Sequence, residues 1–357
     1  MVLLAVATLI VATDCDGALI SYTYHQQAEP AIFASFSTAD HSINFTHVTV
    51  DPSTGRLYAG AVNWIYQFSA DLTLEQQVRT GPVDDSPLCS PSDCSGVEAS
   101  LVRPTNNINK VLVIDHDSRM LLVCGSVHQG SCRRHRLDDI RVSEPLIGMP
   151  VAANDENSST VAFVGPARYF GNAPSKVLYV AASNSRLGPY RDMVPAISSR
   201  YLESGTRLFN IIEKSFTDTA RVDISFHLRD YYLVKYVAGF HSNEFVYFAT
   251  VQRKSHLRAL EEWGYVTRLA RVCASDAGFH SYTEVTISCS SGGVDYNLLQ
   301  DAVLVKAGVS LADDMRIERG ADVLIGVFAK GKDHTDARVA SSSAICLFPL
   351  ADIEQVS

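Results

Sequence analysis

Five copies of one local pattern run along the chain: an apolar β-forming run that ends in a small residue, a polar turn, and a second apolar run. The first runs of the five pairs lie at residues 56–60, 120–125, 176–182, 244–249 and 322–328. Most are preceded by a further apolar run, and helical periodicity is almost absent between them. Three to four antiparallel strands per repeat, without crossover helices, predict an all-β fold of repeated sheets, a β-propeller.

The spacing of the repeats indicates sheets that are joined by long loops. Tyr58, Leu122, Tyr179, Tyr247 and Leu324 take equivalent places in the five pairs, at intervals longer than the roughly 40 to 50 residues of compact propeller blades. The pattern predicts at least about fifteen strands, whereas a β-sandwich needs about seven. One sandwich is therefore disfavoured, and two sandwiches remain an alternative to the propeller.

The composition favours a folded chain and argues against nucleic acid as a partner. Hydrophobic residues make up 46% and charged residues 19% of the sequence, which is ordinary for a protein that buries a large core. The formal net charge is -9, whereas phosphate binding needs a concentrated basic surface. Arg133, Arg134 and Arg136 form the one compact basic cluster, and we interpret them as solvated positions on a strand or turn.

The N-terminal residues are typical of an exported protein. Residues 2–12 form an almost unbroken apolar run, and residues 13–17 form a polar break. This length fits a signal peptide, which we place at residues 1–17, and a buried N-terminal strand is the alternative. Two sequons, at Asn44 and Asn157, agree with a secreted context. No later stretch approaches the roughly 20 apolar residues of a membrane span, so we expect none in this chain.

Two pairs of cysteines are close in sequence. Turn-forming residues separate Cys89 from Cys94 and Cys124 from Cys132, so hairpin-like disulfides are easy to form. Zinc is the alternative, but a zinc site needs a second close pair or nearby histidines. His135 lies near these cysteines, but no second close pair accompanies it at comparable spacing. We therefore favour disulfides, which again indicate the secretory pathway.

No catalytic arrangement stands out in the sequence. Metal-binding histidine motifs, glycine-rich phosphate loops and calcium loops are absent. Ser126 and His128 lack the nucleophile-elbow pattern, so we interpret them as a hairpin turn. The acidic pairs at residues 84–85, 138–139 and 313–314 are interpreted as solvated turns, because neighbours on a strand point to opposite faces. We predict no catalytic, metal or cofactor site and no enzyme activity; a secreted propeller glycosidase is a remote alternative.

A series of short motifs between Leu57 and Asp139 occurs in an order typical of one extracellular family. The motifs lie at residues 57–68, 81–85, 109–115, 121–126, 129–132 and 136–139. In this order they resemble the start of a plexin sema domain. Further similar runs lie at residues 194–200, 243–247, 268–273, 293–302 and 344–348, so the resemblance covers the chain from about residue 36 to residue 350.

The resemblance implies a sema-type β-propeller with about five of the family's seven blades present, each blade an antiparallel four-stranded sheet. Residues 36–357 are accordingly expected to form a sema domain that is truncated at its C-terminal end, and residues 18–35 stay unassigned. Such a chain is expected to leave apolar faces of the first and fifth blades uncovered.

The resemblance also implies the pairing of the cysteines. The expected disulfides join Cys89 to Cys94, Cys124 to Cys132 and Cys289 to Cys346. In plexins the equivalent of Cys273 pairs with a cysteine further downstream. We therefore expect Cys273 to be free in this chain.

The function implied by the resemblance is that of a semaphorin-binding receptor ectodomain that acts by protein contact, in axon guidance, cell adhesion or migration. The full receptor would lie on the extracellular face of the plasma membrane, and this chain would enter the secretory pathway. A co-receptor or self-association through plexin copies are further partners that the family implies. The alternatives are a semaphorin ligand or another sema-domain receptor.

The expected ligand contacts lie in the irregular segment after the third repeat's central strand. Asn184, Arg186, Tyr190 and Arg191 combine turn-forming character with residue types that are enriched at interface cores. In plexins the corresponding region lies near the semaphorin-facing side. A long solvated loop is the alternative interpretation of this segment.

Asn44 and Asn157 generate the first prediction. Both lie in polar segments beside predicted turns, so both should carry glycans when the chain passes through the secretory pathway. Glycosidase treatment of the secreted chain should increase its gel mobility, and Asn44→Gln and Asn157→Gln should each remove part of that shift. Unchanged mobility after treatment would contradict the exported interpretation.

Overall fold

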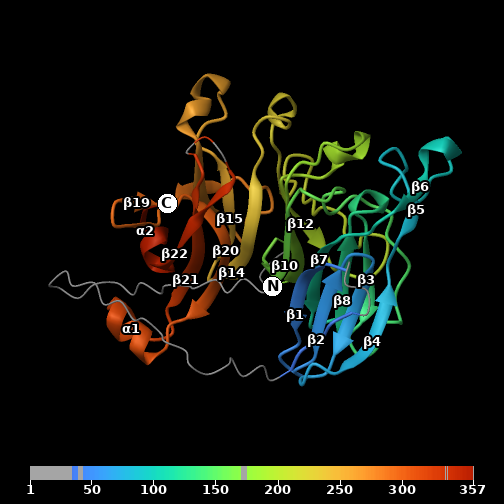
Figure 1. The fold of residues 1–357 in the computed structure, drawn as a ribbon, viewed down its shortest axis with the longest axis horizontal. Coiled ribbons are helices and arrows are strands. Elements are labelled where there is room, and N and C mark those ends of the chain that lie inside the picture. Colours follow the sequence, from blue (N-terminus) through green and yellow to red (C-terminus); the bar gives the residue numbers. More distant parts are fainter. Residues whose placement is uncertain (1–33, 39–42, 170–174, 334, 336, 357) are drawn as a thin grey trace. The chain divides into compact units, whose positions relative to one another are not determined.

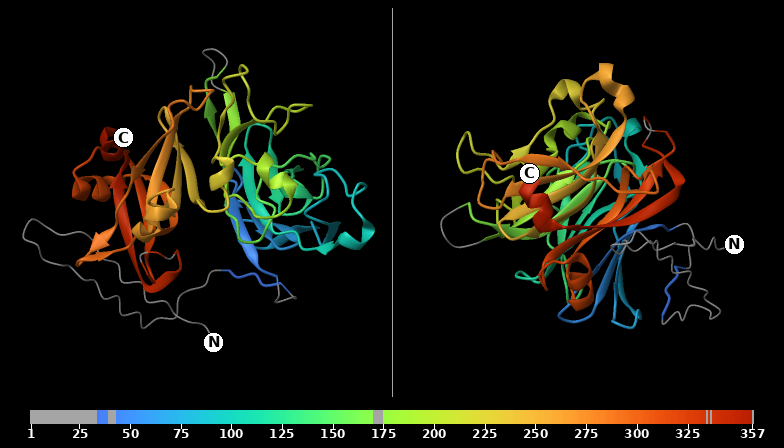
Figure 2. Two further views of the ribbon diagram at one scale, coloured as in Figure 1. Left: turned by 90° about the horizontal axis from the view of Figure 1, so that it is seen from above. Right: turned by 90° about the vertical axis from the view of Figure 1, so that its left-hand side faces the viewer.

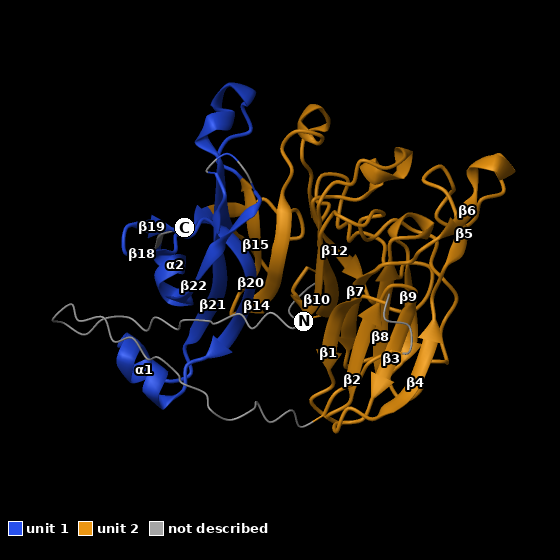
Figure 3. Cartoon of the chain, in the orientation of Figure 1, with its two compact units in different colours: residues 1–33, 253–268, 285–357 blue, residues 34–252, 269–284 orange. Residues whose placement is uncertain are grey.

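The structure, a computed structural model, describes residues 34–38, 43–169, 175–333, 335 and 337–356. The expected signal peptide at residues 1–17, and the segment that follows it up to residue 33, lie outside the described residues. The chain divides into two units, each of which is described by itself (Figure 3). Unit 2 comprises residues 34–252 and 269–284, and the described part of unit 1 comprises residues 253–268 and 285–356.

Five antiparallel sheets follow one another along the chain, and they confirm the prediction of an all-β propeller (Figures 1 and 2). Blade 1 contains β1 (Phe45–Val50), β2 (Leu57–Ala61), β3 (Trp64–Phe68) and β4 (Leu74–Arg79). Blade 2 contains β7 (Asn109–Asp115), β8 (Met120–Gly125) and β9 (Cys132–Arg136). Blade 3 contains β10 (Thr160–Ala167), β11 (Ser175–Ala182), β12 (Ile197–Tyr201) and β13 (Arg221–Val222).

The remaining strands form two further blades and two hairpins. Blade 4 contains β14 (Lys235–Ser242), β15 (Phe245–Arg253), β16 (Tyr265–Cys273) and β17 (Thr283–Thr286). Blade 5 contains β20 (Leu298–Lys306), β21 (Asp322–Gly331) and β22 (Val339–Pro349). The hairpins pair β5 (Val83–Asp85) with β6 (Arg103–Thr105) and β18 (Ser290–Ser291) with β19 (Val294–Asp295).

The helices are short. Among the described residues the α-helices are α1 (Val309–Met315) and α2 (Leu350–Val356). The 3₁₀ turns are η1 (Ala99–Leu101), η2 (His128–Gly130), η3 (Pro189–Met193), η4 (Phe226–Leu228) and η5 (Arg258–Trp263). Within the described residues, no helix has the length and apolar character that crossing a membrane requires.

The strand count per blade differs from the prediction in two places. Blades 1, 3 and 4 have four strands, whereas blades 2 and 5 have three. In blade 2 the segment after β9 forms only isolated bridges to it, between Cys132 and Ile147 and between His135 and Ser143. These two blades therefore fit the three to four strands of the sequence pattern, whereas the four strands that the resemblance implies are not all described there.

The second strand of every blade contains fully buried residues. The five residues that the sequence repeat aligned, Tyr58, Leu122, Tyr179, Tyr247 and Leu324, lie on β2, β8, β11, β15 and β21, and each is fully buried. In blade 1 the register places Tyr58 opposite Thr49 of β1 and Gln67 of β3. Because side chains alternate across a strand, a second strand that is covered on both faces needs apolar residues at consecutive positions.

Apolar clusters join neighbouring blades of unit 2. The first strands β1, β7, β10 and β14 contact one another in this order. Tyr58, Ile65, Leu112, Leu121 and Ile140 belong to the cluster between blades 1 and 2. Leu122, Leu178 and Phe209 belong to the next cluster, and Tyr179, Tyr236 and Phe248 to the one between blades 3 and 4. Apolar packing thus holds each of blades 1 to 3 to the blade that follows it.

The faces of blades 1 and 5 differ in how far they are covered. On blade 1, the ring of Phe36 packs over the face that carries Tyr66 and Phe68, with its centroid 4.7 Å from that of Phe68. On blade 5, α1 packs against a cluster that includes Val323 and Ile325. Other apolar side chains of blade 5 are exposed: Val303, Val327, Val339, Ile345 and Leu347.

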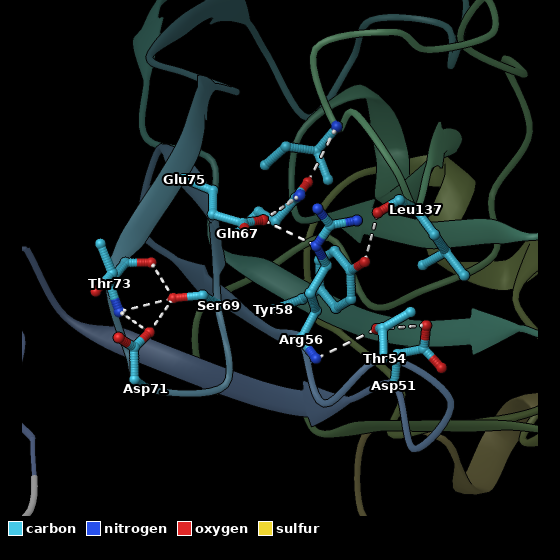
Figure 4. Close-up of polar contacts among 11 residues, drawn as sticks. Asp51, Thr54, Arg56, Tyr58, Gln67, Ser69, Asp71, Thr73, Glu75 and Leu137 are labelled. Carbon is cyan, nitrogen blue, oxygen red and sulfur yellow. Dashed lines mark hydrogen bonds and ion pairs between the residues drawn. The ribbon is translucent and has the colours of Figure 1, made fainter.

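A polar network fixes blade 1 to the segment that follows β9 of blade 2 (Figure 4). The hydroxyl of Tyr58 donates to the carbonyl of Leu137 at 2.5 Å. The buried amide of Gln67 donates to Glu75 at 2.8 Å and accepts from the backbone N–H of Ile140 at 3.4 Å. Arg56 pairs with the same Glu75 carboxylate at 2.9 Å. Each buried polar group therefore has a partner from the other blade or from its own outer strand.

Tyr58→Phe should lower the free energy of unfolding by about 1 to 2 kcal/mol, because the buried Leu137 carbonyl loses its donor. Burial raises the pKa of Tyr58 to about 12, above the usual value of 10. The stabilisation should therefore be complete below about pH 10 and should decrease as the pH rises towards 12, because the unfolded chain loses this proton first. Urea unfolding of wild type and Tyr58→Phe at pH 7 to 11 measures this contribution to the free energy of unfolding.

Tyr190→Phe provides the control, because Tyr190 is half-exposed on a loop. The difference between wild type and Tyr58→Phe should narrow above pH 10, whereas Tyr190→Phe should follow wild type throughout. Equal stability of Tyr58→Phe and wild type at pH 7 would contradict the role assigned to this hydrogen bond.

Candidate functional site

A disulfide-closed loop between β5 and β6 forms the first part of the candidate site. The sulfurs of Cys89 and Cys94 lie 2.06 Å apart, so both are committed to each other and neither is a free thiolate ligand for a metal. Cys89 is fully buried, while Leu88 and Leu101 are about half-exposed on the same loop. Turn-forming residues make the closure short: the Ser90 hydroxyl donates to the Asp93 carbonyl at 3.0 Å.

Gln129 anchors this loop to blade 2. Its side chain is buried, and its Nε2 donates to the carbonyls of Ser86 and Cys89, both at 3.0 Å. Its backbone adopts the left-handed conformation, with φ of 58°. Its Oε1 accepts from the amide of Asn154 at 2.7 Å, and the same Asn154 nitrogen donates to the carbonyl of Leu187 at 3.2 Å. The side chains of Gln129 and Asn154 therefore connect the disulfide loop to the loop at Leu187, about 100 residues further along the chain.

The loop after β11 also packs directly on the disulfide loop. Gly188 has a left-handed φ of 67°, and a Cβ added there would lie 2.0 Å from the carbonyl oxygen of Pro87. A residue with a side chain would not fit at this contact without a backbone shift. The close contact of the two loops therefore depends on glycine at position 188.

The four expected contact residues all lie on the loop after β11, and the structure gives two of them a shared partner. Arg186 donates to the Asp230 carbonyl at 2.9 Å, and Arg191 pairs with the Asp230 carboxylate at 3.0 Å. Tyr190 is half-exposed on η3, and Asn184 is half-buried. Asp230 lies on the loop after β13, so the two arginines connect the two loops.

A second ion pair strengthens the same connection. Arg229 pairs with Asp192 at 2.8 Å, and it also donates to the carbonyl of Ile224 within its own loop. Single exposed ion pairs contribute little to stability, but several that share residues limit the freedom of both loops. The loops after β11 and β13 are thus held together by charged contacts.

We call these three segments, residues 86–101, 184–194 and 223–231, the loop face. In Figure 1 the β5–β6 hairpin and the loops after β11 and β13 lie at the upper end of unit 2. Three large apolar side chains on the last two loops are exposed: Leu187 by 41%, Met193 by 56% and Phe226 by 73%. Exposed apolar side chains on loops that are fixed by hydrogen bonds are typical of protein recognition surfaces.

Two interpretations made from the sequence alone are wrong in part. Asp85 is not on a solvated turn: it is buried on β5, and its carboxylate accepts from the backbone N–H of His128 at 2.9 Å. Arg134 is not solvated either, since it is only 3% exposed and pairs with Glu144 at 2.7 Å. It also donates to the hydroxyl of Ser204 at 2.9 Å, which connects blade 2 to the segment after β12.

The other residues singled out from the sequence lie as follows. Ser126 accepts from the backbone N–H of Ile108 at 3.0 Å, and no hydrogen bond is described between Ser126 and His128. The acidic pair at 138–139 is bound by Arg136 and Arg141, and the pair at 313–314 lies on α1. Asn44 and Asn157 are exposed.

Four further cysteines are joined within their own units. Disulfides connect Cys124 to Cys132 across β8 and β9, and Cys289 to Cys346 within unit 1. Cys273, at the end of β16, is the one free cysteine among the described residues.

Gln129, Asn154 and Asp230 were not singled out from the sequence. Gln129 lies in a Gln-Gly pair between two bridged cysteines, and a left-handed turn there is the only local signal. Asn154 and Asp230 have no local signal, because their partners lie more than 20 residues away.

Comparisons with known proteins agree with the resemblance found in the sequence. No family model matches the chain. The chain is 33% identical over 337 residues to Plexin-A4 of Danio rerio, a match that covers 90% of this chain and 18% of the relative. It spans about a fifth of that relative's length.

Solved structures give the same result for the fold. The plexin A4 extracellular region matches with a TM-score of 0.73 and 31% identity, over 87% of this chain and 34% of that chain. Drosophila Semaphorin 2a matches with a TM-score of 0.56 at 14% identity, over 87% of this chain and 48% of that chain, which shows a shared fold alone. Sequence identity therefore distinguishes the two, and it favours the plexin type.

Gln129→Ala should loosen the loop face, because two carbonyls and the Asn154 amide lose their buried partner. We expect the free energy of unfolding to fall by about 2 kcal/mol. Hydrogen exchange measured by mass spectrometry should become faster in residues 86–101 and 184–194. Gln77→Ala, at an exposed position on β4, is the control; unchanged exchange in 184–194 would refute the anchoring role of Gln129.

Proposed function

The chain carries a sema domain of the plexin type, and from this premise we propose that it is the ligand-recognition domain of a semaphorin receptor. Recognition occurs by protein contact, without chemistry on the ligand. The observation that carries the proposal is the loop face, where exposed apolar side chains and arginines lie on loops fixed by Gln129, Asn154 and Asp230.

Fixed loops support recognition because less conformational entropy is lost when the ligand binds. Leu187, Met193 and Phe226 offer the large apolar surface that the centre of a protein interface needs. Arg186 and Tyr190 add polar contacts beside them. Asn184 and Arg191 are proposed as contacts at the edge, where Arg191 retains its pairing with Asp230.

The position of one sequon limits where a ligand can lie. Asn157 is exposed, and its neighbour Ser158 donates to the carbonyl of Asn184 at 3.5 Å. A glycan on Asn157 would therefore border the loop face on the side of Asn184. The ligand is accordingly proposed to approach over Met193 and Phe226.

The wider role follows from the same premise. We propose the extracellular face of the plasma membrane as the location in the full receptor, with semaphorin as the protein ligand and signalling in axon guidance, adhesion or migration. A co-receptor or a second receptor copy is a proposed additional partner. Support for these comes from the plexin type of the domain.

Phe226→Asp and Met193→Asp test the proposal. Each should weaken binding of the secreted chain to a semaphorin ectodomain by about tenfold or more, because a carboxylate replaces an apolar contact at an interface core. Surface plasmon resonance against a panel of semaphorin ectodomains measures the affinity. Arg186→Glu should also weaken binding, by a smaller factor.

Phe216→Asp is the matched control, since Phe216 is 96% exposed on a loop whose Asp218 contacts His280 instead. Its affinity should equal that of wild type. Equal loss in Phe216→Asp would place the contact elsewhere, and no binding to any member of the panel would overturn the semaphorin class of ligand.

A further inference from the structure

A groove of about 490 Å³ lies between the outer parts of blades 1 and 2, within unit 2. Residues 78–83, at the end of β4 and the start of β5, form part of its lining. Residues of β8, of β9 and of the turn between them form much of the rest. We call it the β4–β9 groove.

The charges that line the β4–β9 groove are all of one sign. Two arginines and two histidines line it, and no aspartate or glutamate does. The chain as a whole has 39 acidic and 30 basic residues. The lining therefore differs from the chain as a whole, in which acidic residues outnumber basic ones. A lining without carboxylates favours an anionic occupant.

Arg79 and Arg133 provide the positive charge. In the described part of the chain, neither guanidinium forms an ion pair, although neighbouring arginines do: Arg134 with Glu144, Arg136 with Asp138 and Arg141 with Asp139. The Nε of Arg79 donates to the Gly81 carbonyl at 2.8 Å, which fixes the side chain at the wall. Arg133 is exposed at its end of the groove. Both are available to a ligand.

The two histidines add directional groups. The Nδ1 of His128 is buried and has no hydrogen-bond partner among the described residues. The Nδ1 of His135 donates to the Ile140 carbonyl at 2.7 Å, which leaves the other ring nitrogen as an acceptor. Burial lowers the pKa of His135 more than the hydrogen bond to Ile140 raises it, and the charge of Arg133 lowers it further, which favours the neutral ring. The two rings therefore add polar atoms to the wall of the groove without adding a carboxylate.

The rest of the lining is mixed, with the polar residues Thr80, Asn107 and Ser131 beside a set of apolar side chains. The apolar side chains in the lining are Val78, Pro82, Val83, Val123, Val127 and Leu146. A sulfated polysaccharide is polar along its whole length and would leave these side chains without apolar partners. A peptide that alternates acidic and aliphatic side chains matches both parts of the lining.

We propose that the β4–β9 groove binds an acidic side chain of an extended peptide segment from a protein partner, with aliphatic neighbours of that side chain against the valines. Arg133 and Arg79 bind the carboxylate. The groove uses residues distinct from the loop face. It is therefore a second recognition site, and it does not depend on the proposed semaphorin ligand.

A fluorescent heptapeptide that alternates glutamate and valine is the probe. Fluorescence polarisation with the secreted chain should show saturable binding. Arg133→Gln and Arg79→Gln should each weaken it by about tenfold, because each removes a charge-assisted hydrogen bond to the carboxylate. A peptide with glutamine in place of glutamate should not bind.

Arg136→Gln is the matched control, because Arg136 lies on the same strand as Arg133 and already pairs with Asp138. Its affinity should match wild type. Equal loss in this control, equal binding of the glutamine peptide, or no saturation up to about 1 mM peptide would overturn the proposal. Displacement by a heparin tetrasaccharide at lower concentration, with the same arginine dependence, would assign the groove to a sulfated glycan instead.

Discussion

Burial of the second strand of each blade is the constraint on which the rest of the structure depends. Tyr58, Leu122, Tyr179 and Tyr247 each lie at this place, and none is exposed to solvent. A strand covered on both faces favours apolar residues on both, so apolar residues run continuously there, as they do at residues 177–182 of β11. Outer strands such as β4 are free to alternate, and the loops are free to vary.

This constraint explains which parts of the fold the sequence predicts. Continuous apolar runs are local signals, and all five second strands were placed correctly from them. Asp85 and Arg134 gave misleading local signals, because their partners lie elsewhere in the chain. Asp85 is bonded to a backbone N–H that is 43 residues away, and Arg134 donates to a carbonyl that is 68 residues away. No pattern of neighbouring residues shows such partners.

In the candidate site, too, the local sequence predicts some features and not others. The composition of the segment at 184–191 was sufficient to place four expected contacts on one loop, but the loop that faces it could not be found from composition. β11 and β13 run in the same direction, because both are antiparallel to β12. The C-terminal ends of these two strands therefore lie at the same end of blade 3. The loops that follow them therefore meet there, and Asp230 reaches Arg186 and Arg191. Topology, and not local sequence, brings the charged contacts together.

Strand alternation also separates a structural role from a recognition role in adjacent, identical residues. Arg133 and Arg134 are neighbours on β9, so their side chains leave opposite faces of the strand. Arg134 is buried, and its guanidinium pairs with the Glu144 carboxylate and donates to the Ser204 hydroxyl. Arg133 points to a groove where no carboxylate is provided. A buried guanidinium without a partner would destabilise the fold, whereas an exposed one remains hydrated at little cost until a ligand replaces the water. The cluster that looked uniform in the sequence therefore contains one residue that holds two blades together and one that is left for a partner.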